Sequence, residues 1–336
     1  MPQPTSPTSA RRSLLRAVSA TGIALVLATA AQAQNAFPSK PIRMIVPAAA
    51  GGSADIVARL LSEKLGQELG QSVVVDNRAG AGGLIGMEAI AKSPADGYTI
   101  GLATQSTLTV APIMNSASKI NPLTEFSPIS AVAQMAGVLT VHPDMKISTF
   151  ADFLAKAKAA PDTYTSGSSG PGSIGQMMIE AMNRDFGVQL RHIPYRGMGP
   201  AVVAALSGET QVLFDQYPSS APHIKNGKLI PVAVGSSTRV ENLPQVPTFK
   251  ELGYPELNEI SITWFGLVAP AHVPADVMKR LQSAVSATLQ APEVRQRLLE
   301  LNASAMSTSG AEFDAMIRSS YARNARIIKA IGMSAQ

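Results

Sequence analysis

Two glycine-containing segments of the chain combine small residues with hydroxyl groups directly before a predicted helix. The first, AAAGGSAD at residues 48–55, follows a short apolar run at residues 43–46 that Pro47 stops. The second, SGSSGPGS at residues 166–173, precedes a helical pattern at residues 174–186. The first N–H groups of a helix are unpaired and lie at the positive end of its dipole. Both segments therefore favour an anion as ligand, although an ordinary turn without a ligand fits the first segment equally well.

Other chemistries fit these segments poorly. Residues 170–175 match the G-x-G-x-x-G pattern of dinucleotide sites, but the next strand, at residues 189–192, ends without the acidic residue that binds a ribose. Ser173 lacks the glycine two positions before it that a nucleophile elbow requires. The four histidines form no metal-binding motif; they are His142, His192, His223 and His272. We therefore predict no enzyme, no cofactor and no metal, with an exported serine hydrolase that uses Ser169 or Ser173 as the alternative.

Further polar groups follow predicted strands, where a ligand cleft is expected. They are Thr104, Ser106, Tyr195, Arg196, Gly197 and Asp215. Each also has a purely structural interpretation: Thr104 as a helix cap, Arg196 as a solvated charge and Asp215 as a turn residue.

The elements that must position these residues alternate between strands and helices from Pro41 onward. Apolar runs rich in β-branched residues predict strands, and the intervening 3.6-residue patterns predict helices. The strands are expected at residues 43–46, 72–75, 98–103, 136–141, 164–166, 189–193, 212–214, 230–234 and 261–268. After residue 268 the chain becomes helical, at 276–289, 292–301 and 310–330. This order predicts an α/β protein with mainly parallel sheets.

Two segments are candidates for crossing between two α/β domains. GVLTV at residues 137–141 would lead outward, and ITWFG at residues 262–266 would return. We therefore predict a discontinuous first domain, residues 34–137 and 262–336, a second domain at 138–261, and a ligand cleft between them.

The N-terminal 33 residues have the pattern of an export signal. Arg11, Arg12 and Arg16 precede an uncharged apolar run at residues 17–31, and AQA at residues 31–33 predicts cleavage after about Ala33. Both Sec and twin-arginine export stay open. The whole chain has 28 Lys and Arg against 23 Asp and Glu, so removing three arginines leaves 25 against 23, about +2. This small charge argues against nucleic-acid binding.

The chain resembles the substrate-binding proteins of the tripartite tricarboxylate transporter, or Bug, family. The resemblance runs from Phe37 to about Ile331 and rests on several motifs in one order. They are PSKPIR at 38–43, GGSADIVAR at 51–59, VDNRAGAGG at 75–83, PADGYT at 94–99, PYRG at 194–197, FD at 214–215, LPQVPT at 243–248 and WFGLVAP at 264–270.

This resemblance implies a periplasmic, monomeric, two-domain type II binding protein that captures a small carboxylate and delivers it to a membrane permease. Presentation of the ligand-bound form to a membrane sensor is a further option. The two glycine segments would grip one carboxylate, partly through ordered water. The expected ligand-binding residues are Ala48, Ala49, Gly51, Gly52, Asp55, Thr104, Ser106, Ser168, Ser169, Gly172, Ser173, Tyr195, Arg196, Gly197, Asp215 and Trp264.

Two positions depart from the pattern of the family. Ala48 stands where an aromatic residue usually follows the proline, and Gln176 stands where the family usually has histidine. Loss of a ring at residue 48 would enlarge the pocket, so we expect a ligand bulkier than a short aliphatic diacid.

Overall fold

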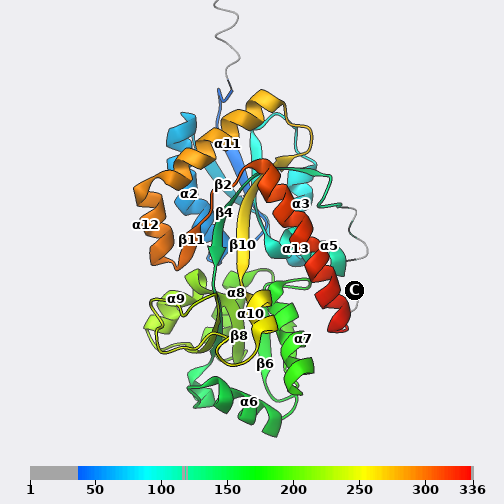
Figure 1. Cartoon of the computed structure of the whole chain (residues 1–336), viewed down its shortest axis with the longest axis vertical. Coiled ribbons are helices and arrows are strands. Elements are labelled where there is room, and N and C mark those ends of the chain that lie inside the picture. The colour runs from blue at the N-terminus through cyan, green and yellow to red at the C-terminus, as the bar shows by residue number, and fades with distance from the viewer. Residues whose placement is uncertain (1–36, 116–117, 119, 334–336) are drawn as a thin grey trace, which may run out of the picture. The chain divides into compact units, whose positions relative to one another are not determined.

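The structure is a computed structural model that describes residues 37–115, 118 and 120–333. The predicted export signal and its cleavage site at Ala33 lie outside the described residues. Lys40–Gln336 form one compact unit. It contains two β-sheets with helices packed around each of them (Figure 1). The predicted α/β architecture is thus confirmed.

The first lobe is built on a six-stranded sheet with the order β11-β4-β10-β3-β1-β2. Its strands are β1 (Ile42–Val46), β2 (Val73–Asn77), β3 (Thr99–Thr104), β4 (Phe126–Met135), β10 (Thr263–Pro270) and β11 (Ala303–Ala305). Its helices are α2 (Ser53–Leu69), η1 (Ala81–Gly83), α3 (Leu84–Ala91), α4 (Gln105–Thr109), α5 (Ala111–Met114), α11 (Ala275–Gln290), α12 (Pro292–Glu300) and α13 (Gly310–Ala330).

The second lobe is built on a five-stranded sheet with the order β7-β6-β8-β5-β9. Its strands are β5 (Gly137–Val141), β6 (Thr165–Ser168), β7 (Arg191–Pro194), β8 (Val212–Gln216) and β9 (Ile230–Gly235). Its helices are η2 (Pro143–Met145), α6 (Phe150–Ala159), α7 (Ile174–Phe186), α8 (Met198–Leu206), α9 (Tyr217–Lys225) and α10 (Pro255–Ser261).

The chain crosses between the lobes twice, from β4 to β5 through Ala136 and from α10 to β10 through Ile262 (Figure 1). The crossings make the sheets mixed, where mainly parallel ones were expected. β10 pairs antiparallel with both β3 and β4, because it returns from the second lobe against their direction. β5 likewise pairs antiparallel with β8 and β9. The short β11 also pairs antiparallel with β4. The pairs of β1 with β2 and β3, and of β6 with β7 and β8, are parallel.

Helix α2 shows how the sequence produces the helices that flank the cleft. Its buried positions Val57, Leu61, Leu65 and Leu69 recur every four residues, which is the spacing of one helical face. The helix ends because Gly70 adopts the left-handed conformation with φ of 72°, a conformation that costs glycine little. Burial of this apolar stripe fixes the direction in which the N-terminus of the helix points.

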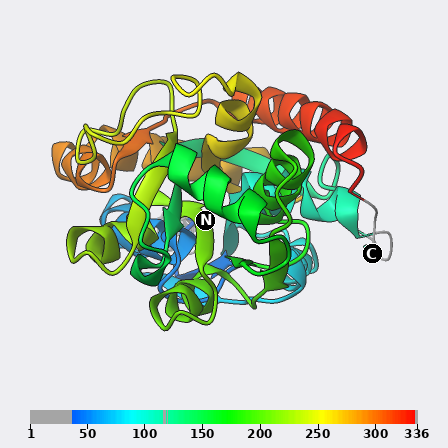
Figure 2. The same cartoon turned by 90° about the horizontal axis from the view of Figure 1, so that it is seen from below.

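An apolar contact joins the lobes away from the crossing strands. Val110 and Met114, in and beside α5, and Ile328 near the end of α13 belong to the same buried cluster as Met177 and Met178 of α7. Viewed from below, the red α13 runs alongside green helices of the second lobe (Figure 2). The end of α13 therefore packs on the second lobe, although residues 262–336 were assigned to the first domain.

The core of the first lobe depends on a close approach at Gly266 of β10. The ring of Phe313 lies against this glycine and packs edge-on to Trp264, with ring centroids 5.4 Å apart and an interplanar angle of 87°. A Cβ atom at residue 266 would lie only 2.0 Å from Phe313 Cζ. Phe313 is fully buried and so cannot move aside.

We therefore predict that Gly266→Ala destabilises the protein by about 1–3 kcal/mol, the usual cost of overpacking a core. Urea unfolding measures the change. The loss of stability caused by Gly266→Ala should be smaller in a Phe313→Leu background, because leucine leaves free the space that the phenylalanine ring fills. An equal cost in both backgrounds would show that the contact with Phe313 is not responsible.

Candidate functional site

A small cavity lies between the lobes at the carboxyl ends of β1, β3, β6 and β8. Its volume is about 50 Å³. It is lined by Ala48, Gly52, Ser53, Ala54, Thr104, Gln105, Ser106, Ser169, Ile174, Gly175, Met198, Gln216, Thr263 and Phe265. This space holds only a few water-sized groups, so the bulkier ligand expected from Ala48 does not fit the present arrangement of the lobes.

Helices begin at this cavity from both lobes. Helices α2, α7, α8 and α9, of 17, 13, 9 and 9 residues, all place first-turn or cap residues in its wall. The N-caps of α2, α8 and α9, namely Gly52, Gly197 and Gln216, make no side-chain capping bond within the described part of the chain. The lining residues include no charged side chain. Positive potential here therefore comes from helix N-termini, which favours a small anion.

Asp55 holds the first glycine loop in position without lining the cavity. Its carboxylate accepts hydrogen bonds from Gly51 N at 3.0 Å and from Arg59 Nε at 2.9 Å. Burial alone would raise the pKa of Asp55, but the bonds from Arg59, Gly51 and Asn77 outweigh burial and lower it. Asn77 Nδ2 also donates to Ala48 O at 3.2 Å. Asp55 is absent from the cavity wall, and its negative charge is offset by Arg59.

The second glycine loop is held by side chains that also lie outside the cavity wall. Ser168 Oγ is 2.6 Å from His192 Nε2 and accepts from Gly170 N at 3.1 Å. Burial lowers the pKa of His192, which keeps the ring neutral near pH 7. Gly172 N donates to Gln176 Oε1 at 2.8 Å, so the unusual Gln176 fastens the loop. These bonds fix the shape of the loop.

Polar bonds tie the two lobes together beside the cavity. Ser53 Oγ lies 2.8 Å from Ser219 Oγ and accepts from Ser219 N at 3.2 Å. Ser219 Oγ in turn donates to Asp215, and Ser53 Oγ also donates to Gln216 O at 3.3 Å. Across the cavity, Ile174 N donates to Ser106 Oγ at 3.1 Å. We call the linked groups Ser53, Ser219 and Asp215 the serine bridge.

Asp215 anchors the serine bridge within the second lobe. Its side chain is fully buried and accepts from Gln216 N at 2.7 Å and Ser220 Oγ at 2.9 Å, as well as from Ser219 Oγ. Burial raises the pKa of Asp215 to about 7 in spite of these bonds. Asp215 therefore positions hydroxyl groups and a backbone amide at the edge of the site.

The structure divides the predicted site residues into two groups. Five of them line the cavity: Ala48, Gly52, Thr104, Ser106 and Ser169. The others are absent from its wall, and several of those position the loops, as described for Asp55, Ser168, Gly172 and Asp215. Ala49 packs against Gly197, where a Cβ would lie 2.7 Å from Ala49 Cβ. Gly51 is exposed, and Ser173 caps α7 by accepting from Gln176 N at 3.2 Å.

Tyr195, Arg196 and Trp264 are also absent from the cavity wall. Tyr195 donates its hydroxyl proton to Glu209 at 2.8 Å, and burial together with this bond raises its pKa to about 12. Arg196 is exposed. Trp264 is buried in the core of the first lobe, where its Nε1 donates to Ser320 Oγ at 3.2 Å. Successive residues of a strand face opposite sides, so the neighbours Thr263 and Phe265 reach the cavity instead.

Several lining residues were not among the expected ligand-binding residues. Among them, Gln105 is fully buried, and neither Nε2 nor Oε1 has a hydrogen-bond partner among the described residues. Thr263 Oγ1 is likewise buried and unpaired. The position of Gln105 directly after a strand that ends at the cleft was the available signal for it.

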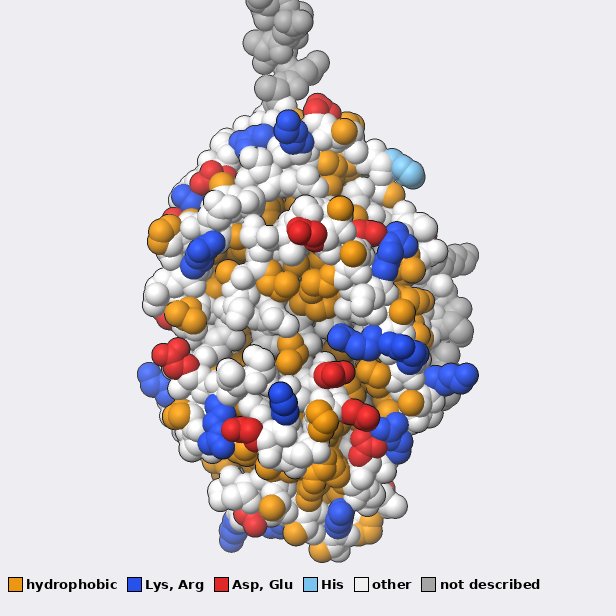
Figure 3. Space-filling view, in the orientation of Figure 1, with side chains coloured by type: hydrophobic (Ala, Val, Ile, Leu, Met, Phe, Trp, Pro, Cys, Tyr) orange, Lys and Arg blue, Asp and Glu red, His pale blue; other side chains and the backbone are white. Residues whose placement is uncertain are grey.

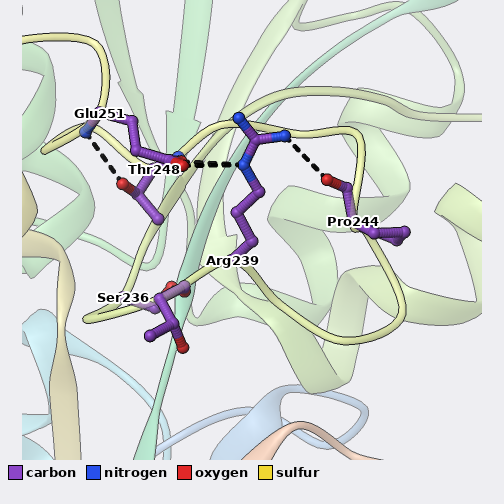
Figure 4. Close-up of polar contacts among 6 residues, drawn as sticks. Ser236, Arg239, Pro244, Thr248 and Glu251 are labelled. Carbon is purple, nitrogen blue, oxygen red and sulfur yellow. Dashed lines mark hydrogen bonds and ion pairs between the residues drawn. The ribbon is translucent and has the colours of Figure 1, made fainter.

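A second cavity of about 290 Å³ lies beside the two crossings and contains Arg239 in its wall. This arginine is already engaged (Figure 4): its Nε donates to Glu251 at 3.0 Å and its Nη1 to Pro244 O at 2.9 Å. Glu251 also accepts from Thr248 N at 2.8 Å. Arg239 thus ties down a loop of the second lobe.

Other kinds of site find no support in the described residues. None of their helices combines the length and hydrophobicity needed to cross a bilayer. They contain no cluster of three or more His, Asp or Glu side chains that could hold a metal ion. Lys and Arg side chains lie among Asp and Glu side chains over much of the face seen in Figure 3.

Residues 57–333 match the family model described as the tripartite tricarboxylate transporter family receptor. The chain belongs to this receptor family. It is 37% identical over 261 residues to BugT of Bordetella pertussis, covering 77% of this chain and 79% of BugT. It also resembles the periplasmic binding protein BugD, with a TM-score of 0.86, 30% identity and coverage of 89% of this chain and 100% of BugD.

A third relative, MatC of Rhodopseudomonas palustris with bound malate, has a TM-score of 0.82 and 26% identity, with 87% of this chain and 100% of MatC covered. The predicted family and binding-protein fold are therefore confirmed. The protein is a periplasmic-type solute-binding receptor and not an enzyme. The histidine beside the second glycine loop, His192, contacts the buried Ser168.

Asp215 should make stability depend on pH. An unfolded aspartate has a pKa of about 3.9, so between about pH 4 and pH 7 the folded protein holds a proton that the unfolded chain releases. Stability from this group is therefore fully present below pH 4 and is lost as the pH rises to about 7. Between pH 4 and pH 7 the free energy of unfolding of the wild-type protein should fall by about 2–4 kcal/mol because of Asp215, and Asp215→Asn should abolish this fall. Urea unfolding at several pH values measures the change.

The exposed Asp162 provides the matched control, since its carboxylate makes no ion pair within the described residues. Asp162→Asn should leave the pH profile of the wild-type protein unchanged. Parallel profiles for wild type and Asp215→Asn would show that Asp215 ionises normally in the folded state.

Proposed function

We propose that the protein captures a small organic carboxylate in the cavity between its lobes and delivers it to the membrane subunits of a tripartite tricarboxylate-type transporter. One observation carries this proposal: four helices of nine or more residues start at a cavity that no charged side chain lines. Such a site can compensate an anion with helix dipoles and with first-turn N–H groups, although those of Tyr217 and Ser219 in α9 already donate to Ala136 O and Ser53 Oγ.

Family membership supports the class of ligand and the place of action. The family description names a tricarboxylate transporter receptor, and MatC was solved with malate. The predicted export signal would bring the chain to the periplasm, where we propose that it acts as a monomer. Membership of this receptor family supports delivery of the ligand to a permease.

The direct contacts that we propose are the five predicted residues in the cavity wall together with Ser53. Hydrogen bonds to a charged group contribute about 1.5–3 kcal/mol each. Three or four of them would support micromolar binding, about −8 kcal/mol, after the costs of ordering the ligand and the loops. Asp55, Ser168, Gln176 and Asp215 would act indirectly by holding the loops in position.

We further propose that binding closes two domains with the boundaries given above, 34–137 with 262–336, and 138–261. The present arrangement resembles the closed state, because residues from both lobes are in contact beside the cavity. Ser53 and Ser106 of the first lobe both bond to the second lobe. A ligand larger than the 50 Å³ cavity would require the lobes to sit further apart.

A negative charge placed in the cavity wall tests the proposed function. Ala48→Asp should weaken binding of any carboxylate at least tenfold, because two unit charges 4 Å apart repel by about 4 kcal/mol at an effective dielectric constant of 20. Isothermal calorimetry on the mature protein, with ligands found by a thermal-shift screen of mono-, di- and tricarboxylates, measures the effect.

Ala50→Asp is the matched control, since Ala50 belongs to the same loop but is exposed and lies outside the cavity wall. It should change the affinity less than threefold. Equal losses in the two variants would place the ligand elsewhere, and the absence of any carboxylate ligand from the screen would contradict the proposed function itself.

A further inference from the structure

The cavity wall contains a second set of polar groups that the anion-binding loops do not explain. Gln105 and Thr263 both line the cavity and are 0% and 2% exposed. Gln105 Nε2, Gln105 Oε1 and Thr263 Oγ1 have no hydrogen-bond partner within residues 37–115, 118 and 120–333. Buried side-chain polar atoms are almost always paired, so three unpaired atoms from two lining residues require an explanation.

These two residues come from adjacent elements of the first lobe. Phe265 of β10 pairs with Thr104 of β3. Gln105 follows Thr104 directly, and Thr263 precedes Phe265 by two positions, so both lie at the end of the sheet that borders the cavity. Neither belongs to the glycine loops at residues 48–55 and 166–173. The wall of the cavity therefore has one part made of helix N-termini and another made of a carboxamide and a hydroxyl.

We infer that Gln105 and Thr263 select a carboxylate ligand that also carries a neutral group with both a donor and an acceptor, namely a carboxamide or a hydroxyl. This inference rests on the proposed function and narrows its ligand class. The side-chain amide of Gln105 offers donors at Nε2 and an acceptor at Oε1. Only a partner that both donates and accepts satisfies the two ends together.

A second carboxylate fits this part of the wall less well. An ionised carboxylate only accepts hydrogen bonds, so it would leave Gln105 Oε1 unpaired and facing another oxygen. The cavity wall also offers no Lys, Arg or His side chain to compensate a second charge. An apolar group would leave all three polar atoms unpaired, which is the costly outcome for buried groups.

The experiment compares three ligands of nearly equal shape by isothermal calorimetry: succinamate, succinate and 4-methylpentanoate. They share one carboxylate and end in a carboxamide, a carboxylate and a branched alkyl group. A second series, 3-hydroxybutyrate against butyrate, tests the hydroxyl. In at least one series the ligand with the neutral polar group should bind at least tenfold more tightly than its partners.

Variants assign this preference to the two residues. Gln105→Leu and Thr263→Val keep the side-chain volumes and remove the polar atoms, and each should reduce the preference at least fivefold while leaving the apolar ligands bound as well or better. Without ligand, Gln105→Leu should unfold at the same temperature as wild type or higher, because it removes unpaired buried atoms. Gln67→Leu, on the exposed face of α2, is the control and should keep the preference.

The outcomes separate this inference from the proposed function. If carboxylates bind but succinate or the apolar ligands equal the neutral polar ones, the inference is wrong and the proposed function stands. If both Gln105→Leu and Thr263→Val keep the wild-type preference, or Gln105→Leu lowers the unfolding temperature, the two side chains have structural partners and the inference is again wrong. If no carboxylate in the thermal-shift screen binds, the inference and the proposed function are both wrong.

Discussion

The unpaired N–H groups at the starts of helices are the constraint on which the rest of the site depends. A helix cannot satisfy its own first amides, so these groups need caps, water or a ligand. Here β1, β3, β6 and β8 all end at the interlobe cavity, and the helices that follow them begin there. A site that must recognise an anion can in this way do so without a charged side chain in its wall.

The residues that hold the loops in position keep negative charge away from the helix N-termini at the cavity. The charge of Asp55 is offset by Arg59, and burial raises the pKa of Asp215 to about 7, which favours its neutral form. Gln176 also keeps negative charge away from the cavity. It holds Gly172 N through a neutral amide oxygen and adds no charge to the second loop.

Two different kinds of contact hold the lobes together. Beside the cavity the contacts are polar: the serine bridge, and Ser106 with Ile174 N. At the side, Val110, Met114 and Ile328 are buried with residues of α7. Water can replace the polar contacts at little cost, whereas exposing the apolar ones costs about 25 cal/mol for each Å². We therefore expect the lobes, when they open, to separate at the polar contacts beside the cavity and to rotate about the two crossings and the apolar contact.

Regular elements with strong patterns were predictable from the sequence, and the site was predictable only in part. Helices α7 and α13 match the expected ranges 174–186 and 310–330, because their apolar spacing and caps are clear. Strand β4 was missed because Pro128 and polar residues interrupt its pattern. The two glycine loops and Thr104 could be predicted from the residue types that turns and helix caps prefer. Whether Trp264 or its neighbours face the cavity depends on strand register, and the role of Gln105 depends on tertiary burial, neither of which local pattern determines.

Closure of the two lobes around a carboxylate is most directly tested by a distance measured across the cleft. Helices α2 and α9 contact each other there through Ser53 and Ser219, and the chain has no cysteine, so Glu63→Cys and Lys225→Cys give two unique exposed labelling sites. Pulsed electron–electron resonance should show a broad distribution of distances without ligand and a shorter, narrower one with a saturating carboxylate. An unchanged distribution, in a sample in which calorimetry confirms binding, would contradict closure of the lobes on the ligand.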